Sequence, residues 1–226
     1  MKPTHVTELP LKTQDYLKHI WDIYEHTGHE AQLKDIAARM GEKASTASEA
    51  IKRLSALGLV EHKKYAGIVL TELGRSYAVA VVRRHRLLET FLVEVLGYTW
   101  DEVHDDAELL EHSVSDRLLE RIDAHLNYPL RDPHGDPIPT AEGEVTEVST
   151  RFLDSCAIGE KIWIDRILDH EPDVLRYLAE LQIVPGTGLV LVESPMPGML
   201  NVRKIDEENT FSLTTQAAAL IAVKSQ

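Results

Sequence analysis

The sequence predicts a mainly helical protein that ends in a smaller β-rich part. Through most of the first 126 residues, apolar side chains recur at the three- and four-residue steps of an α-helix. Four prolines between positions 129 and 139 then interrupt this pattern, because proline cannot continue a helix. Beyond them, apolar residues alternate or form short runs, as they do in strands. The expected fold class is therefore α+β, mainly α.

The first 73 residues predict three helices followed by a hairpin. Apolar stripes over 11–26 and 33–40 indicate two helices, and residues 44–54 indicate a third with a hydroxyl-rich first turn. Residues 59–70 are typical of a hairpin with Tyr65-Ala66-Gly67 at its tip. This order is that of a winged helix-turn-helix, in which the second helix of the pair enters the major groove of DNA. We therefore expect residues 1–73 to form a DNA-binding domain.

Side chains suited to DNA contact gather on the third helix and on the hairpin. Hydroxyl groups near the helix start can reach bases or phosphates, and cations can reach phosphates. The candidate residues are Ser45, Thr46, Ser48, Lys52, Arg53, Lys63 and Lys64. The alternative is that Ser45 and Thr46 only cap a helix and that the lysines are solvated, since helix-turn-helix patterns are weak signals.

Residues 74–128 predict a long helix and two shorter ones. The long helix starts near Thr71 and runs to about Gly97, and the shorter helices lie between Trp100 and Leu126. Their exposed apolar surface is a candidate dimer interface, which binding to palindromic DNA would require.

Three histidines and three glutamates between positions 85 and 112 fall at helical spacing. Steps of three and four residues share one helix face, so Glu108, Glu111 and His112 should project together, with His104 one turn earlier. Imidazole and carboxylate without thiol suit manganese, iron, cobalt or zinc. An exposed helix with scattered polar residues would not explain why lysine and arginine are absent from 101–116. The cluster therefore predicts a metal site with room for two ions.

The formal net charge of −13 is unevenly distributed. Residues 1–73 hold ten Lys plus Arg and ten Asp plus Glu, whereas residues 74–226 hold the remaining 14 basic and 27 acidic residues. The N-terminal part can therefore approach DNA, while the acidic middle of the chain attracts cations.

The end of the chain predicts a linker and a second domain. Residues 129–148 combine proline, glycine and aspartate, which indicates a semi-rigid linker, and residues 149–226 form the β-rich domain. Its strand-like runs are 162–164, 189–192, 199–202 and 211–213, with a helical turn at 174–181. Many short strands in so few residues indicate a small open barrel.

Composition indicates a soluble protein of a reducing compartment. No apolar run approaches the length of a membrane span, and the first residues lack a signal-peptide core, so we expect no membrane partner. The single cysteine, Cys156, excludes an internal disulfide and fits the cytoplasm.

Two motifs resemble those of the diphtheria-toxin-repressor family of metal-dependent regulators. They are Arg84-His85-Arg86-Leu87-Leu88-Glu89 and Val103-His104-Asp105-Asp106-Ala107-Glu108-Leu109-Leu110-Glu111-His112. The likeness extends to Asp15-Tyr16-Leu17, Ser45-Thr46-Ala47-Ser48 and Gly135-Asp136-Pro137-Ile138-Pro139. The resemblance implies the long form of these proteins, with a C-terminal Src-homology-3-like barrel, and a homodimer that binds palindromic operator DNA.

The resemblance also implies two metal sites in each subunit. It places one ion among Asp15, Glu108, Glu111 and His112. It places a second ion among His85, Glu89 and His104, completed by a carboxylate from the barrel. Glu171 aligns best with that last ligand, and the alternatives are His170 and Asp173.

Departures from the iron-responsive members favour manganese. Those members carry methionine and cysteine where this chain has Asp15 and Glu108, and hard oxygen in place of soft sulfur shifts preference toward manganese. The chain is similar in this respect to the manganese transport regulators. Lys18 stands where some short members have a glutamate, so we do not expect their particular two-ion arrangement. The implied cofactor is Mn(II), two ions per subunit, with Fe(II), Co(II) or Zn(II) as substitutes.

We therefore expect a cytoplasmic manganese-dependent repressor, not an enzyme, that controls metal homeostasis and transport genes. One ion shared by Asp15 and the dimerisation helices would fix the DNA-reading domain, whereas the carboxylates would repel one another without it. An iron-dependent repressor of the same family is the first alternative. A metallohydrolase is the second, although no general base or nucleophile is evident. A metal buffer without any effect on DNA is the third.

Overall fold

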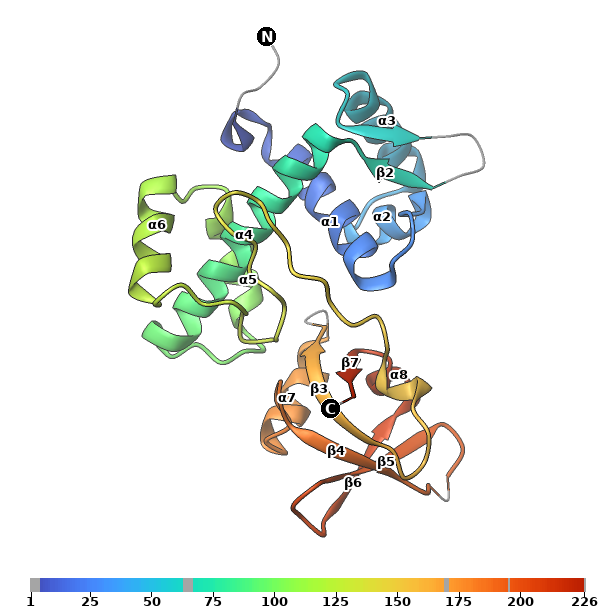
Figure 1. The fold of residues 1–226 in the computed structure, drawn as a ribbon. Coiled ribbons are helices and arrows are strands. Elements are labelled where there is room, and N and C mark those ends of the chain that lie inside the picture. The colour runs from blue at the N-terminus through green and yellow to red at the C-terminus, as the bar shows by residue number, and fades with distance from the viewer. Residues whose placement is uncertain (1–4, 63–66, 169–170, 195, 226) are drawn as a thin grey trace.

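The computed structural model describes residues 5–62, 67–168, 171–194 and 196–225. Helices dominate up to position 125 and strands dominate from position 161, so the predicted α+β class is confirmed. Figure 1 shows two helical bodies side by side and a β-rich body beneath them, with the linker running between the helical and β-rich parts.

The N-terminal domain contains the predicted winged helix-turn-helix. Its elements are η1 (Val6–Glu8), α1 (Leu11–Thr27), α2 (Leu33–Arg39), α3 (Ala44–Ala56), β1 (Val60–His62) and β2 (Ile68–Leu70). The two strands are antiparallel, with Val60 opposite Leu70. Apolar stripes of the three helices meet in one core, in which Leu17, Ile36 and Ile51 are almost fully buried. Tyr65 and Ala66, at the predicted hairpin tip, lie outside the described residues.

One long helix connects the two helical domains. The predicted long helix and two shorter ones are confirmed as α4 (Glu72–Leu96), α5 (Val103–Glu111) and α6 (Asp116–His125). The first half of α4 contributes Val81 to the N-terminal core, and its second half packs Leu87 and Leu92 in a separate core with α5 and α6. Because α4 belongs to both cores, the side chains at its middle face α1 as well as α5.

The C-terminal domain is a five-stranded antiparallel sheet with short helices. Its strands are β3 (Lys161–Ile167), β4 (Gly188–Val192), β5 (Met199–Lys204), β6 (Thr210–Thr214) and β7 (Ile221–Lys224), in the order β6-β5-β4-β3-β7. Helical segments are η2 (Leu153–Ser155), α7 (Pro172–Glu180) and α8 (Thr215–Ala218). The predicted strand runs fall in β3 to β6 and the predicted helical turn falls in α7. The sequence pattern did not indicate β7, α8 or η2.

The start of the predicted linker packs closely against both of its neighbours. Backbone hydrogen bonds from Ile138 N to Leu130 O and from Asp132 N to Asp136 O, both 3.0 Å, close a hairpin over 130–138. This linker hairpin accepts a hydrogen bond from Ile167 N of β3 at His134 O, over 2.9 Å. It therefore connects the barrel to the helical part of the chain.

Gly135 lies at the tip of the linker hairpin, where it meets β3. Its φ is +94°, and an added Cβ would lie 2.5 Å from the carbonyl oxygen of Asp165. Glycine alone avoids a steric clash in this conformation and at this distance.

In the part of the chain that the structure describes, no helix combines the length and the apolar character needed to cross a membrane.

Candidate metal centre

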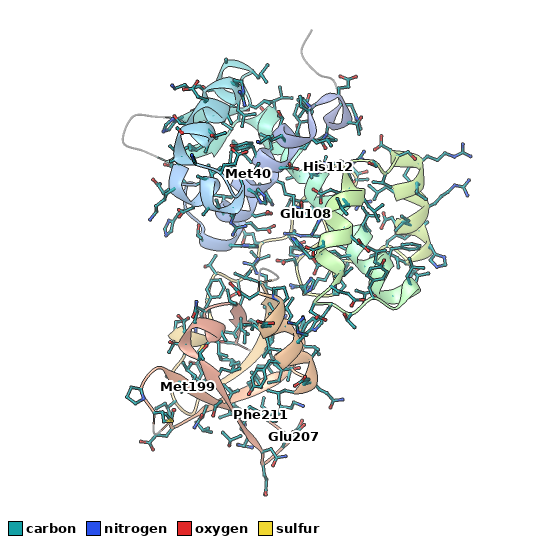
Figure 2. The ribbon with its side chains drawn as sticks, turned by 180° about the vertical axis from the view of Figure 1, so that it is seen from behind. Met40, Glu108, His112, Met199, Glu207 and Phe211 are labelled. Atoms are coloured by element: carbon teal, nitrogen blue, oxygen red, sulfur yellow. The ribbon has the colours of Figure 1, made fainter. Side chains whose placement is uncertain are left out.

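Three helices bring the predicted ligands together. Asp15 lies on α1, and His85 and Glu89 lie four residues apart on α4. His104, Glu108, Glu111 and His112 come from α5 and its C-cap residue, whereas Glu171 lies elsewhere, at the start of α7. Figure 2 shows Glu108 and His112 where α5 meets the helices of the N-terminal domain. The helical spacing therefore presents the predicted α5 side chains toward α1 and α4.

The first group of candidate ligands joins the two helical domains. Asp15, Glu111 and His112 each offer a ligand atom, and these atoms lie within 4.8 Å of one another. Nε2 of His112 is 2.8 Å from Oδ1 of Asp15 and 3.6 Å from Oε1 of Glu111. Nδ1 of His112 lies 3.1 Å from Oε1 of Gln14, which helps orient the ring. A carboxylate of α1 thus meets a carboxylate and an imidazole of the α5 end.

The second group contains Glu108, which the resemblance assigns to the first. Glu108, His85 and His104 offer ligand atoms within 4.8 Å of one another. The rings of His85 and His104 are 4.9 Å apart at 70°. Glu108 lies one turn before Glu111 and His112 on α5, and this places it beside His104 and His85 rather than beside Asp15.

Lys18 lies between these two groups. Its ammonium group donates to Glu108, and Nζ is 2.8 and 3.1 Å from the two carboxylate oxygens of Glu111. Nδ1 of His85 is 3.1 Å from the same nitrogen. We call the two groups together with Lys18 the α1–α5 cluster. Because Lys18 neutralises two of its carboxylates, these do not simply repel one another in the metal-free protein, as the sequence led us to expect.

The charges of the α1–α5 cluster perturb its pKa values. Burial disfavours the Lys18 ammonium, but Glu111 and Glu108 outweigh this effect and raise its pKa. Burial also disfavours the charged form of His85, yet neighbouring carboxylates, chiefly Glu89, raise its pKa to about 9. The hydrogen bond to Asp15 raises the pKa of His112. His85 therefore favours the protonated form, and a metal ion that bound this ring would replace a proton.

Glu89 belongs to a third group that involves the linker hairpin. Glu89, Asp132 and His134 are all buried, and their ligand atoms lie within 4.8 Å of one another. Oε2 of Glu89 is 3.8 Å from Nδ1 of His134, and Nε2 of His134 is 2.8 Å from Trp100 O. We call these three residues the linker cluster. Glu89 Oε1 also lies 2.9 Å from His85 Nε2, so the two clusters are adjacent.

Electrostatics in the linker cluster favours a bound cation. Burial, together with the charges of Asp136 and Glu89, raises the pKa of Asp132 well above its usual value. Burial would likewise raise the pKa of Glu89, but its histidine neighbours, first His85, hold it well below that value. A positive charge would be favourable beside carboxylates that are so deeply buried.

The structure places Glu171 apart from these groups. Glu171 is the exposed N-cap residue of α7, and among the described residues it belongs to none of the compact groups of ligand atoms. Asp173 pairs with Arg176, which also lies 3.3 Å from Asp101 and so connects α7 to the segment before α5. His170 lies outside the described residues.

A cleft of about 510 Å³ leads to both clusters. Lys18, His85, Glu89 and Glu108 line it, and so does Pro172, the first residue of α7. The cleft gives a cation a path to the ligands, and the barrel forms part of its rim.

Two buried arginines hold the linker hairpin in place. Arg86 of α4 binds Glu25 of α1 through both carboxylate oxygens, at 2.5 and 3.3 Å, and donates to Pro137 O over 2.7 Å. Arg166 of β3 donates to Asp136 over 2.8 Å. Glu25, His26 and Asp136 also form a compact group, but these guanidinium groups already engage both of its carboxylates.

The candidate DNA-contacting residues lie mostly on the surface of α3. The helix starts at Ala44 with Lys43 as its N-cap residue, so neither Ser45 nor Thr46 occupies the capping position. The exposed candidates are Ser45, Thr46, Lys52 and Arg53, and Ser48 is partly buried. Lys52 pairs with Glu49 over 2.7 Å. Lys63 and Lys64 lie outside the described residues.

The donor sets fit divalent transition metals. Each compact group combines imidazole nitrogen with carboxylate oxygen, which suits manganese, iron, cobalt and zinc. Cys156 lies in the barrel segment, where its thiol donates to Phe152 O, and it contributes to none of these groups. A winged helix-turn-helix domain shares this candidate metal centre with a second helical domain. This arrangement places the chain in the class of metal-regulated DNA-binding proteins.

The chain belongs to the diphtheria-toxin-repressor family of metal-dependent regulators. Residues 8–68 match the N-terminal DNA-binding domain of iron-dependent repressors, and residues 71–140 match their metal-binding and dimerisation domain. Residues 152–225 match the FeoA domain. The family consists of transcriptional repressors, so the prediction that the chain is not an enzyme is confirmed.

The chain is similar both to repressors named as iron-dependent and to repressors named as manganese-dependent. The iron-dependent repressor IdeR of Mycobacterium tuberculosis is 38% identical over 134 residues, which cover 59% of this chain and 58% of that protein. The diphtheria toxin repressor of Corynebacterium diphtheriae is 29% identical, over 80% of this chain and 84% of that protein. A solved manganese-dependent transcriptional repressor in complex with manganese is 48% identical, covers 95% of this chain and 100% of its own, and has a TM-score of 0.88.

Sequence reasoning missed Asp132 and His134 as partners of Glu89. The signal was present in the run Arg131-Asp132-Pro133-His134-Gly135-Asp136, where a histidine and two aspartates stand in a segment of prolines. Only the folded hairpin brings them to α4, more than 40 positions earlier in the chain. The sequence also draws attention to Lys18, but it does not reveal the contacts of that side chain.

Proposed function

We propose that this chain is a manganese-dependent transcriptional repressor that binds palindromic operator DNA as a homodimer and controls metal-ion homeostasis and transport genes. The observation that carries the proposal is the first ligand group, in which α1 of the DNA-binding domain contributes Asp15 and the end of α5 contributes Glu111 and His112. A repressor acts where the chromosome lies, so we place this activity in the cytoplasm.

The metal choice rests on the donor atoms. Asp15 and Glu108 provide oxygen at positions where the iron-responsive relatives are expected to carry sulfur, and oxygen favours manganese. The related manganese repressor supports the same choice. The names of the curated relatives favour iron, which therefore remains the alternative within the family.

The mechanism is a coupling between metal and DNA sites. Asp15, Glu111 and His112 would hold the first ion, and its positive charge would be shared by both helical domains. Asp15 then ties α1 to the α5 end, and the position of α3 relative to the dimer becomes fixed. By thermodynamic linkage, operator DNA should tighten manganese binding by the same factor by which manganese tightens DNA binding.

The second ion of each subunit has two candidate ligand sets. The family resemblance gives His85, Glu89 and His104 with Glu171. The geometry favours Glu89 with Asp132 and His134, because these buried side chains already converge. We therefore propose the linker cluster as the second site and Glu171 as the less favoured ligand.

Exposed apolar side chains support the homodimer. Leu109 on α5 is 74% exposed and Leu118 on α6 is 50% exposed, and Leu96 at the end of α4 is 57% exposed. Residues 71–140 also match a dimerisation domain. A second copy of the chain would cover this apolar surface and would place two α3 helices for the two halves of a palindrome.

The test is a DNA-binding titration with and without manganese. An operator is first selected from random duplexes with manganese-loaded protein, and its fluorescence anisotropy then reports binding. Manganese should strengthen binding by tenfold or more, about 1.4 kcal/mol. Exposed Glu120 of α6, changed to alanine, provides a control that should behave as wild type. Operator affinity that does not respond to manganese would refute the proposal, and manganese binding without any DNA response would identify a metal buffer.

The same assay tests the proposed DNA surface on α3. Arg53→Met should weaken binding to all duplexes alike and reduce the salt dependence by about one counterion, because a phosphate contact is lost. An unchanged salt dependence would place Arg53 away from the DNA backbone.

A further inference from the structure

Lys18 brings a fixed positive charge into the α1–α5 cluster from the helix that supplies Asp15. Three positions separate the two residues, so both side chains project from the same face of α1. The side chain of Lys18 is only 5% exposed. The cation is therefore tethered, and solvent does not compete for its contacts.

The ammonium group connects the two ligand groups. Glu108 belongs to one group and Glu111 to the other, and Lys18 donates to both carboxylates. Such a bridge between two carboxylates is a position that a metal ion could otherwise take, because it offers oxygen from both sides and His85 nitrogen nearby.

The two groups differ in how far they depend on Lys18. In the first group, Asp15 and His112 pair with each other over 2.8 Å, so two ligands can accept an ion while Lys18 stays on Glu108. In the second group, an ion would share Glu108 with the ammonium and would lie beside its positive charge. Coulomb repulsion at such short distance is strong in a buried site.

We propose that the ammonium group of Lys18 fills the second cation position of the α1–α5 cluster and so limits that cluster to one divalent ion. This inference rests on the proposed metal-dependent function and adds to it a residue that determines metal stoichiometry. It also separates the second ion of each subunit from the first, because the linker cluster is a distinct group of ligands that meets the α1–α5 cluster where Glu89 contacts His85.

The test is a count of manganese ions in Lys18 variants of the full-length chain. Lys18→Met removes the charge with little change of length, and Lys18→Gln removes it but keeps a hydrogen-bond donor. Both should bind one more Mn(II) per subunit than wild type, measured by calorimetric titration and by metal analysis after desalting. The affinity for this added ion should fall by tenfold or more when Glu108→Gln is combined with Lys18→Met.

Two variants serve as controls. Lys18→Arg keeps the positive charge and should keep the wild-type count. Lys12→Met removes an exposed lysine of the same helix, which pairs with Glu42, and should also keep it. If Lys18→Met folds poorly, Lys18→Gln provides the measurement instead, because its amide can still donate a hydrogen bond to a carboxylate.

A second readout is thermal stability, which is measured first without metal. Thermal unfolding of metal-free Lys18→Met should begin at lower temperature than that of wild type, since the buried Glu111 and the partly buried Glu108 lose their partner. Manganese should then raise the midpoint of this variant more than that of wild type. If Lys18→Met and Lys18→Gln both bind the same number of manganese ions as wild type, this inference is wrong, whereas the proposed function is unaffected. Failure of the wild type to bind manganese at all would overturn the proposed function together with it.

Discussion

The α1–α5 cluster and the linker cluster both place carboxylates against α4, but they balance this negative charge in different ways. In the α1–α5 cluster the Lys18 ammonium group and the charged His85 ring supply the positive charge, and Asp15 and Glu108 keep 27% and 31% of their side chains exposed. In the linker cluster, histidine neighbours keep Glu89 charged and Arg86 lies 3.8 Å from Asp132. Beside this cluster, the guanidinium groups of Arg86 and Arg166 are held by several fixed partners.

The difference separates a cluster whose charge is balanced by an ammonium group from one that lies beside fixed guanidinium groups. An ammonium group is a compact point charge that one divalent cation could replace, whereas a planar guanidinium group binds a fork of fixed acceptors. The first cluster is therefore suited to sensing a metal ion. The two guanidinium groups beside the second cluster are suited to keeping the linker hairpin, and with it the barrel, attached to α4.

Loss of Arg86 should have the largest effect on stability. Arg86→Met leaves Glu25 buried without its guanidinium partner, which should cost about 3–5 kcal/mol of unfolding free energy. Thermal unfolding of the metal-free protein would measure this loss. Arg151→Met removes a more exposed pair with Glu160 and should cost much less, because solvent screens that pair. Equal losses in the two variants would show that the linker hairpin is not held as we describe.

The pH dependence of metal-free stability should follow His85. Its pKa of about 9 in the folded chain lies above the usual value of 6.5, so the charged ring stabilises the fold fully below pH 6.5. This stabilisation, about 3 kcal/mol, should disappear as the pH rises from 6.5 to 9. Unfolding midpoints in a chelator across this range measure it. His85→Gln should flatten the slope, and the same change at exposed His125 should not; an equal slope in His85→Gln would exclude this assignment.

Loss of Asp15 should change the manganese requirement for DNA binding much more than it changes the stability of the fold. Asp15→Ala removes a partly exposed ligand, so it should raise the manganese concentration needed for DNA binding by about 100-fold. Its unfolding free energy without metal should change by less than about 1 kcal/mol. Anisotropy titrations and metal-free melts report the two quantities. A large loss of stability with little change in the manganese requirement would assign Asp15 to the fold instead.

The smallest expected effect concerns the second metal site, for which Asp132 and Glu171 are rival carboxylate ligands. Asp132→Asn should weaken the second manganese ion by about tenfold, and Glu171→Ala should change it by less than about twofold, because Glu171 is exposed and lies apart from the convergent side chains. Calorimetric titration distinguishes the two. The reverse ranking would favour the ligand from the barrel.

Much of the helical architecture follows from the sequence, because periodicity reports which faces are buried. The four-residue steps from His85 to Glu89 and from His104 to Glu108 are enough to predict which residues share a helix face. Periodicity does not report how α5 is rotated relative to α1, and this rotation decides that Glu108 joins His104 rather than Asp15.

Other features depend on contacts between distant parts of the chain. The linker hairpin brings His134 to Glu89 across 45 positions, and no local pattern encodes that approach. The strand β7 is only four residues long, and it follows a run of alanines that fits a helix as well as a strand. Its pairing with β3 becomes evident only in the folded sheet.

Because Gly135 lies so close to Asp165 O, a single mutation at this glycine could detach the barrel from the metal-binding helices. Any other residue at 135 would push the linker hairpin away from β3, since a Cβ would lie 2.5 Å from that oxygen. Such a lesion would leave every candidate ligand side chain chemically intact. A genetic screen for repressors with altered control should therefore return changes at this glycine as a class of their own, distinct from losses of ligands or of DNA contacts.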